Sequence, residues 1–182
     1  MSKTSTSHRA LEERRADLAI LRLHAPVLKQ HLQTETLYDD SYVVVAGART
    51  PWVRRRRIEL AELIEEPWAL PPSDSLLGSV FVEAFQSRGL DYPRASVSTQ
   101  TMPARAALAA TGQFFSIMPG SALKFSTANA AVKALPIDLP TTRRPTGILR
   151  YGNRTLSPAA ELFIDCARAV VKPLVTSVPA RR

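Results

Sequence analysis

The stretch YVVVAG at residues 42–47 decides the fold class of this sequence. Its β-branched residues follow one another without a polar interruption, which is typical of a strand covered on both faces. A strand of this kind needs helices beside it, so the stretch predicts an α/β protein. Residues 16–21, which read ADLAIL, and residues 114–118, which read FFSIM, predict further buried strands.

Two helices are expected in the middle of the chain. Residues 76–88 carry apolar side chains at helical spacing, with cap side chains before them at 73–75 and Gly89 as a stop behind them. Residues 102–111 form a second such segment, with a proline in the first turn and Gly112 just past the end. Strands and helices therefore alternate, and we expect the strands to be mostly parallel.

The last helix is expected to begin at Ser157-Pro158, where serine caps the helix and proline takes the first helical position, and to end at Pro173. Cys166 on this helix is interpreted as a small buried hydrophobic residue and not as a nucleophile. The helix is expected to bury one apolar stripe, made of Leu162, Phe163, Cys166, Ala167, Val170 and Val171.

Length and composition indicate one medium domain or two small lobes. The chain has 182 residues, of which 45% are hydrophobic and 22% charged, as in ordinary globular proteins. No apolar run reaches the roughly 18 to 20 residues that cross a bilayer, and no secretory signal is visible, so we expect no membrane and a cytoplasmic location. Residues 1–10 are expected to be a disordered leader and residues 176–182 a tail.

The charge of the chain permits an anionic partner without identifying one. The net charge is +8, carried by 19 arginines and 5 lysines against 16 acidic residues. The run of arginines at 54–57 could contact phosphates, but no aromatic residues interleave it for base stacking. We therefore interpret this run as a solvated turn.

The sequence offers little for catalysis. The three histidines are His8, His24 and His31, and no HExxH, Cys-x-x-Cys, G-x-S-x-G or phosphate-loop pattern occurs. We therefore predict no enzyme, no catalytic residue, no metal site and no cofactor. Trp52 and Trp68 stand among apolar neighbours and are interpreted as packing residues.

Polar residues at strand-to-helix junctions are the candidates for ligand binding. Arg22 follows the buried strand at 16–21, at the carboxyl end where open α/β sheets bind ligands, although it could also be a solvated loop arginine. Residues 99–101, which read Thr-Gln-Thr, precede a helix whose free N–H groups favour an anion, although they could simply cap it. Pro119 follows another strand, and Ser73 stands at a similar junction.

An ordered series of short motifs resembles the effector-binding domain of LysR-type transcriptional regulators. The resemblance runs from about Leu11 to Leu174 and is nearest to the subgroup named for a regulator of a galactose-binding protein. The motifs that carry it are RADLAI at 15–20, LYDD at 37–40, VVVA at 43–46, LAEL at 60–63, EPWAL at 66–70, AF at 84–85, GL at 89–90, ALAATG at 107–112, MP at 118–119 and NRTLSPAA at 153–160.

The resemblance implies an α/β, two-lobed fold like that of type II periplasmic-binding proteins, with a small effector between the lobes. Residues 11–175 would form this domain, with lobe 1 at 11–71 and 124–175 and lobe 2 at 72–123. The first lobe would be incomplete at its N-terminus. The effector-binding residues that we predict from position and resemblance are Arg22, His24, Ser73, Thr99, Gln100, Thr101 and Pro119.

The implied function is the sensing of a small effector, an anion or a sugar-like molecule, to control transcription. Nothing before Leu11 resembles the winged helix-turn-helix of the family, so we expect contact with DNA only through a full-length family partner, in a homo- or hetero-dimer. The alternative is a solute-binding protein of the same fold, and the absence of a signal peptide counts against its periplasmic form.

Overall fold

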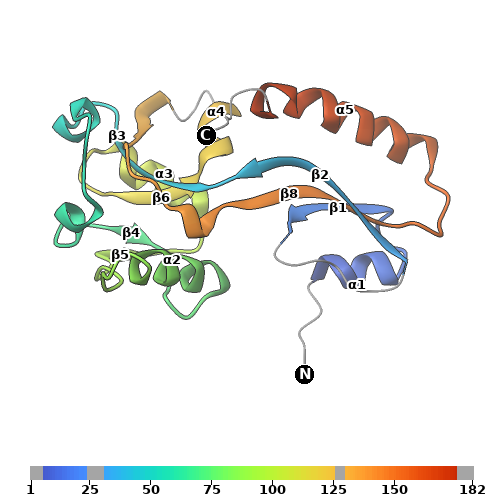
Figure 1. The fold of residues 1–182 in the computed structure, drawn as a ribbon, viewed down its shortest axis with the longest axis horizontal. Helices are drawn as coiled ribbons and strands as arrows, with labels where there is room; N and C mark the ends of the chain where they lie inside the picture. Colours follow the sequence, from blue (N-terminus) through green and yellow to red (C-terminus); the bar gives the residue numbers. More distant parts are fainter. Residues whose placement is uncertain (1–5, 24–30, 126–129, 176–182) are drawn as a thin grey trace. The chain divides into compact units, whose positions relative to one another are not determined.

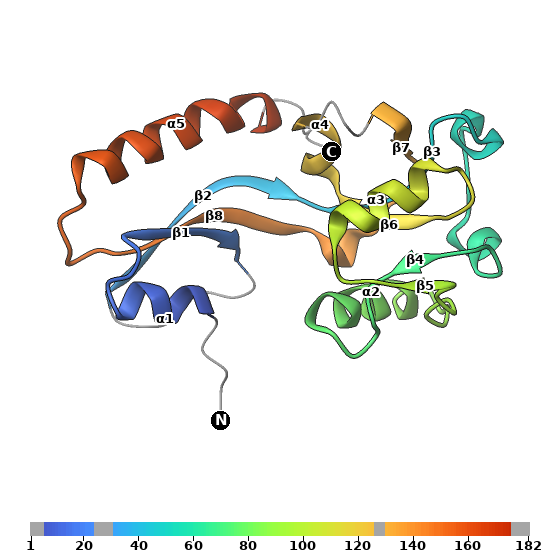
Figure 2. The same cartoon turned by 180° about the vertical axis from the view of Figure 1, so that it is seen from behind.

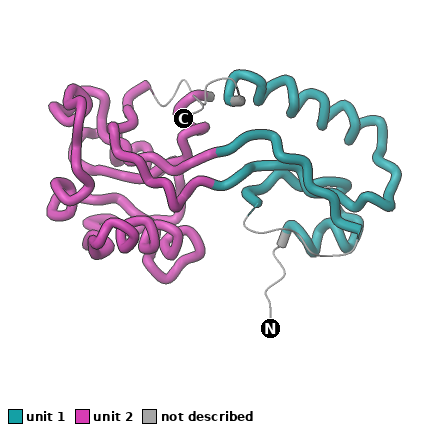
Figure 3. Tube along the Cα trace, in the orientation of Figure 1, with its two compact units in different colours: residues 1–39, 144–182 teal, residues 40–143 magenta. Residues whose placement is uncertain are grey.

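The structure is a computed structural model that describes residues 6–23, 31–125 and 130–175. It contains two compact units, unit 1 at residues 1–39 and 144–182 and unit 2 at residues 40–143 (Figure 3). The lobe bounds that the sequence predicts, with changes at 71–72 and 123–124, stay a prediction. Within unit 2, β3 (Tyr42–Gly47) hydrogen-bonds to β6 (Ser116–Pro119) and β7 (Val132–Ala134).

Unit 1 is a three-stranded sheet between helices. The strand order is β1 (Leu18–Arg22), β8 (Arg144–Tyr151), β2 (Leu32–Asp40), and β1 runs antiparallel to β8. Helix α5 (Pro158–Val175) lies along one side of these strands and α1 (Thr6–Glu12) on the other (Figure 1). Leu37, Ile148 and Ile164 form the buried cluster that joins α5 to the sheet.

The start of unit 1 differs from the prediction in two places. Helix α1 begins at Thr6, inside the predicted leader. Leu11 is fully buried, which explains why the segment is ordered. Strand β2, which begins at Leu32, is not among the strands that the sequence predicts. Most polar residues of this strand, LQTETLYDD, are exposed, so its sequence lacks the unbroken apolar run of a buried strand.

The predicted apolar stripe of α5 is wrong in part. Cys166 is exposed, and so are Leu162 and Phe163, at 65% and 51%. The helix instead buries Ala160, Ile164 and Leu174. Both sets of residues have helical spacing, and the sheet selects the second. Pro173 lies inside the helix, which is two residues longer than predicted, because a proline so close to the end removes few backbone hydrogen bonds.

Unit 2 contains the stretch that decides the fold class. Strand β3 lies between β6 and β7 and runs antiparallel to both, whereas β4 (Ala69–Leu70) and β5 (Val97–Ser98) pair in parallel. A parallel bridge from Trp68 to Phe115 connects the two sheets. Among the described residues, three strand pairings, β1 with β8, β3 with β6 and β3 with β7, are antiparallel and one, β4 with β5, is parallel. This is contrary to prediction, because the order of strands along the chain does not reveal which strands become neighbours.

Helices cover both faces of β3, as its sequence predicts. Helix α2 (Leu76–Gln86) packs Phe81 and Phe85 into the cluster that contains Val44, and α3 (Met102–Ala110) packs Ala109 against Val45. Both predicted helices are confirmed to within two residues of their ends. The shorter elements of unit 2 are η1 (Pro51–Arg54), η2 (Leu60–Leu63), α4 (Gly120–Phe125) and η4 (Pro140–Thr142).

Both tryptophans pack as predicted. Trp68 is fully buried, and its Nε1 donates to the Leu63 carbonyl over 2.7 Å. The Trp52 ring meets Phe115 edge-on, with ring centroids 5.6 Å apart. Across the described residues, no helix has the length and apolar character to span a membrane.

Candidate functional site

One edge of the unit 2 sheet gathers the carboxyl ends of its parallel strands. Strands β4 and β5 pair with Leu70 opposite Ser98, and β6 runs beside β4, where the Ser116 hydroxyl donates to the Ala69 carbonyl over 2.8 Å. Because these strands point the same way, the segments that follow them share one edge. We name this the carboxyl edge, and its segments are 71–73, 99–101 and 119–121.

Five of the predicted effector-binding residues lie at the carboxyl edge. The Thr99 N–H donates to the Leu70 carbonyl over 2.9 Å, so the segment after β5 starts beside the segment after β4. Pro119 lies opposite Tyr42, the first residue of β3. The structure therefore brings together Ser73, Thr99, Gln100, Thr101 and Pro119. Their role in binding stays a prediction.

The helices that leave this edge start differently. At α2, the Ser75 hydroxyl accepts a hydrogen bond from the Gly78 N–H over 3.0 Å and caps the helix. At α3, Thr101 occupies the cap position without a side-chain cap hydrogen bond, and its own N–H donates to Thr99 Oγ1 over 3.3 Å. The positive end of the α3 dipole therefore lies at the carboxyl edge without a side-chain acceptor from its cap residue.

A buried arginine lies one turn into α3. Arg105 is 2% exposed, and its Nε and Nη1 make no hydrogen bond to the described part of the chain. The guanidinium carbon is 6.0 Å from the centroid of the Phe81 ring. Two tyrosines, Tyr42 and Tyr92, are its other electrostatic neighbours among the described residues, and no carboxylate is among them.

Burial shifts the pKa values in this cluster. It lowers the pKa of Arg105 below its usual value, while the phenols of Tyr42 and Tyr92 act in the opposite direction. Burial raises the pKa of Tyr92 to about 12, and the charge of Arg105 opposes that rise. The Tyr92 hydroxyl donates to the Pro71 carbonyl over 3.0 Å, so the cluster reaches the carboxyl edge.

Sequence reasoning missed Arg105, although a signal was present. Helix α3 reads MPARAALAA, so Arg105 is its single charged residue. It stands four positions before Ala109 and so on the same face of the helix, which α3 buries. A single charged residue on the buried face of a helix indicates a paired or functional group, because charged side chains are rarely buried without a partner.

The remaining predicted residues belong to unit 1. Arg22 is the last residue of β1, where it lies opposite Thr146 of β8, and it is half-buried. His24 lies outside the described residues. A contact of either residue with an effector stays a prediction.

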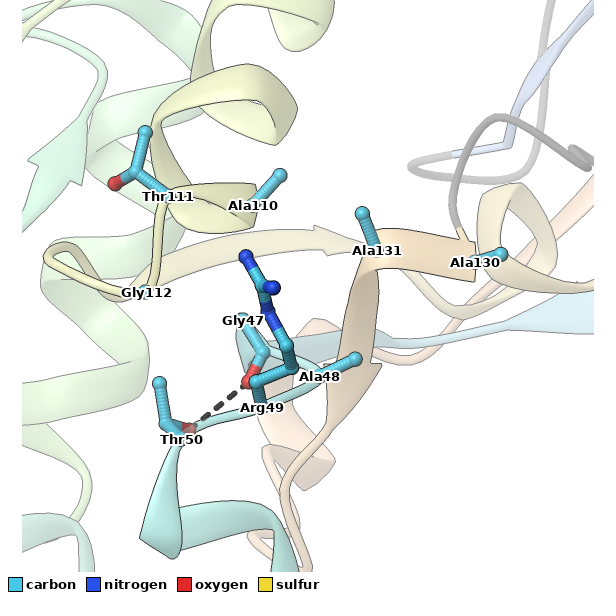
Figure 4. A pocket seen from close by; sticks show the side chains of 9 residues that line it. All are labelled: Gly47, Ala48, Arg49, Thr50, Ala110, Thr111, Gly112, Ala130 and Ala131. Carbon is cyan, nitrogen blue, oxygen red and sulfur yellow. Dashed lines mark hydrogen bonds between the residues drawn. The ribbon is translucent and has the colours of Figure 1, made fainter.

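A cavity of about 460 Å³ lies at the other end of α3 (Figure 4). The side chain of Arg49 extends into it, toward Ala110. The hydroxyls of Thr50 and Thr111 already donate to backbone carbonyls, those of Gly47 and Leu108. The carboxyl end of α3 brings negative dipole charge to this cavity, which disfavours an anion there.

The arginine run at 54–57 is exposed, as predicted for a solvated turn. Arg55 forms an ion pair with Glu62 at 2.7 Å, and its guanidinium carbon lies 5.0 Å from the centroid of the Trp52 ring. In the described parts of the chain, no group of His, Cys, Asp and Glu side chains is arranged to hold a metal ion.

The family model described as the LysR substrate binding domain matches residues 1–172. The chain therefore belongs to this family, and the resemblance that the sequence motifs indicate is confirmed. The fold is the α/β, type II periplasmic-binding-protein-like fold of LysR effector-binding domains.

Known relatives agree with this assignment. The transcriptional dual regulator GltC of Bacillus subtilis (strain 168) is 24% identical over 156 residues, which are 86% of this chain and 51% of GltC. The chain thus spans about half the length of that relative.

Solved structures show the same fold. The regulatory domain of Synechocystis PCC6803 CcmR, in complex with 2-PG, has a TM-score of 0.71 and 20% identity over 92% of this chain and 79% of that one. The effector binding domain of QuiR, in complex with shikimate, has a TM-score of 0.63 and 23% identity over 92% of this chain and 77% of that one.

Proposed function

We propose that this chain is the effector-sensing part of a LysR-type transcriptional regulator. The observation that carries the proposal is the convergence of five predicted site residues on the carboxyl edge in a domain of this family. Its structural relatives CcmR and QuiR are in complex with 2-PG and shikimate, which supports a small molecule as the ligand. Binding would shift a conformational equilibrium that DNA-binding parts of the regulator sense.

The chemistry of the carboxyl edge suits a small polar ligand. The hydroxyls of Ser73, Thr99 and Thr101 and the amide of Gln100 can donate or accept hydrogen bonds, and the α3 dipole favours negative charge. Pro119 would supply an apolar surface. From unit 1, Arg22 and His24 are the proposed contributors.

The rest of the proposal concerns the whole regulator. The known relatives are transcriptional regulators, so we propose that the chain senses a ligand and catalyses no reaction. Contact with DNA would come through a full-length family partner in a dimer, in the cytoplasm. A reporter gene whose expression responds to the effector only when this chain is present would support that role.

A thermal-shift screen of organic acids, phosphates and sugars tests the ligand-binding proposal. We expect at least one compound to raise the melting temperature of the chain, because a ligand that binds the native state stabilises it. Thr99→Val should reduce this shift. The control is Thr111→Val, a matched change at the other end of α3, which should leave it intact. A screen without any stabilising compound, or equal shifts in both variants, would contradict the proposal.

A further inference from the structure

We propose that Arg105 anchors the effector of this domain, and that the effector carries an oxyanion, either a carboxylate or a phosphate. The inference rests on the proposed function and adds the class of ligand to it. It also assigns a binding role to a residue that the sequence motifs do not indicate.

The first argument is the burial of an unpaired charge. Arginine is rarely buried unless its guanidinium is paired, because the charged group loses its hydration. Arg105 is 2% exposed, and its Nε and Nη1 have no hydrogen-bond acceptor in the described chain. The Phe81 ring, 6.0 Å from the guanidinium carbon, offers a cation–π contact but accepts no strong hydrogen bond. An oxyanion would supply the acceptors that this cluster lacks.

The second argument is the position of the guanidinium at the carboxyl edge. Helix α3 packs on the face of β3 that carries Val45, whereas Tyr42, Phe81 and Tyr92 belong to the cluster on the opposite face, with Val44. Figure 2 shows α3 and α2 on either side of these strands. A side chain of α3 that reaches the far cluster must therefore pass around the end of the strands. Tyr42 begins β3 opposite Pro119, the last residue of β6, so this end is the carboxyl edge.

The third argument is that the helix start adds to the charge of Arg105. Helix α3 has nine residues, and its N-terminal N–H groups lie at the same edge without a side-chain cap from Thr101. In a helix, a side chain leans toward the N-terminus, so the Arg105 guanidinium extends toward these groups. Positive dipole charge and guanidinium charge then act on the same ligand atoms.

A second arginine near α3 provides the contrast. Arg49 lies in the cavity at the carboxyl end of the helix, is exposed, and faces the negative end of the dipole (Figure 4). The helix therefore favours an anion beside Arg105 and opposes one beside Arg49. A neutral sugar would use neither the guanidinium charge nor the dipole, so the cluster favours an acid over a sugar as the effector.

The test measures ligand binding by the full 182-residue chain and its variants, using calorimetry and thermal shift. The probes are inorganic phosphate, sodium benzoate as a carboxylate, and galactose as a neutral sugar. We expect one of the anions to bind at millimolar concentration or better. Arg105→Met should weaken this binding by roughly 10- to 100-fold, because charge-assisted hydrogen bonds are lost, and Arg105→Lys should weaken it less. Arg49→Met is the matched control and should bind like the wild type.

The outcomes separate this inference from the proposed function. The stronger anion identifies the effector group as phosphate or carboxylate. Equal anion binding by Arg105→Met and wild type would overturn the role of Arg105. Binding of galactose but of neither anion would overturn the ligand class; if Thr99→Val abolished that binding, the proposed function would stand. If circular dichroism shows that Arg105→Met is unfolded, Arg105→Lys becomes the deciding variant. The proposal would be overturned if Arg105→Lys bound the anion with the affinity of the wild type and NMR showed the same bound geometry as in the wild type.

Discussion

Helices α2 and α3 start from the same edge of one sheet, yet they are completed in different ways. Helix α2 caps itself with Ser75 and buries only apolar or small residues, namely Gly78, Phe81, Ala84 and Phe85. Helix α3 has no side-chain cap and buries Arg105 together with Ala109. Phe81 of α2 is the aromatic ring over which the Arg105 guanidinium lies.

The difference between α2 and α3 distinguishes a helix that packs the core from one suited to bind a ligand. The start of α2 is capped by Ser75 and its buried residues are apolar or small, which is how a helix that serves stability is built. Helix α3 keeps a charge and a helix start unsatisfied within the described chain, at a cost in stability. Natural proteins keep such local conflicts where function requires them.

The largest expected effect on stability comes from the apolar core residues of α2. Phe85 is fully buried, with ring contacts to Trp68 at 5.7 Å and Tyr92 at 5.8 Å. Phe85→Ala should lower the free energy of unfolding by roughly 3–5 kcal/mol, measured by urea denaturation. Phe163→Ala, at an exposed position of α5, is the control and should cost less than about 1 kcal/mol. Similar losses in both variants would show that α2 does not dominate the core.

The second prediction concerns alkaline pH. Burial raises the pKa of Tyr92 to about 12 in the folded chain, from 10.0 for an exposed tyrosine. Because the folded-state value is raised, the contribution of Tyr92 is fully present below pH 10 and is lost as the pH rises toward 12. The loss should be about 1–2 kcal/mol after allowance for the partial exposure of this phenol.

Unfolding curves at intervals across this alkaline range measure the effect. In Tyr92→Phe the curves should depend less on pH than in the wild type, since the group that titrates is gone. A steeper dependence in the variant would contradict the assigned pKa shift. The variant also loses the hydrogen bond from the Tyr92 hydroxyl to the Pro71 carbonyl, which lowers its stability relative to the wild type below pH 10. This difference should shrink toward pH 12, because a deprotonated tyrosine has no proton to donate.

The third prediction tests whether α3 sacrifices stability. Without ligand, Arg105→Met should raise the free energy of unfolding by about 1 kcal/mol or more, because an unpaired buried charge is replaced by an apolar side chain of similar length. Chemical denaturation measures the change, with Arg49→Met as the exposed control. A clear loss of stability in Arg105→Met would mean that its contacts with Phe81 and the tyrosines outweigh the cost of burial.

The smallest effect separates the two helix starts. Ser75→Ala should lower the free energy of unfolding by about 1 kcal/mol, because the Gly78 N–H loses its cap. Thr101→Ala should change it by less than about 0.5 kcal/mol, since Thr101 makes no cap hydrogen bond with its side chain. Thermal unfolding of both variants measures these changes. Equal losses of stability would show that the starts of α2 and α3 do not differ in capping.

Local signals predict the elements of unit 2 well. Helical spacing and the glycines behind each segment place α2 and α3, and Gly89 and Gly112 have the positive φ values, 70° and 82°, that helix stops require. The strand at 42–47 matches β3 in both bounds. Five of the candidate residues lie at the carboxyl edge for the same reason, because a residue that follows a strand lies at the carboxyl end of that strand, and their role in binding stays a prediction.

Signals that depend on distant partners were misleading. In α5, two apolar stripes have helical spacing, and contact with Leu37 and Ile148 selects the one that contains Ile164. In β2, the polar residues Gln33, Thr34, Thr36 and Asp39 are tolerated because they are exposed. Strand direction was predicted from the order of elements, but β3 pairs antiparallel with strands about 70 and 90 residues further along the chain.

The sequence by itself determined the α/β class, the family, the two central helices and the residues that follow each strand, because these depend on neighbours a few positions away. Only the tertiary structure decided which strands lie side by side, which face of α5 is covered and what surrounds Arg105. In the sequence, Arg105 is one of 19 arginines. Its burial arises because Tyr42, Phe81 and Tyr92, which belong to other segments of the chain, meet around its guanidinium.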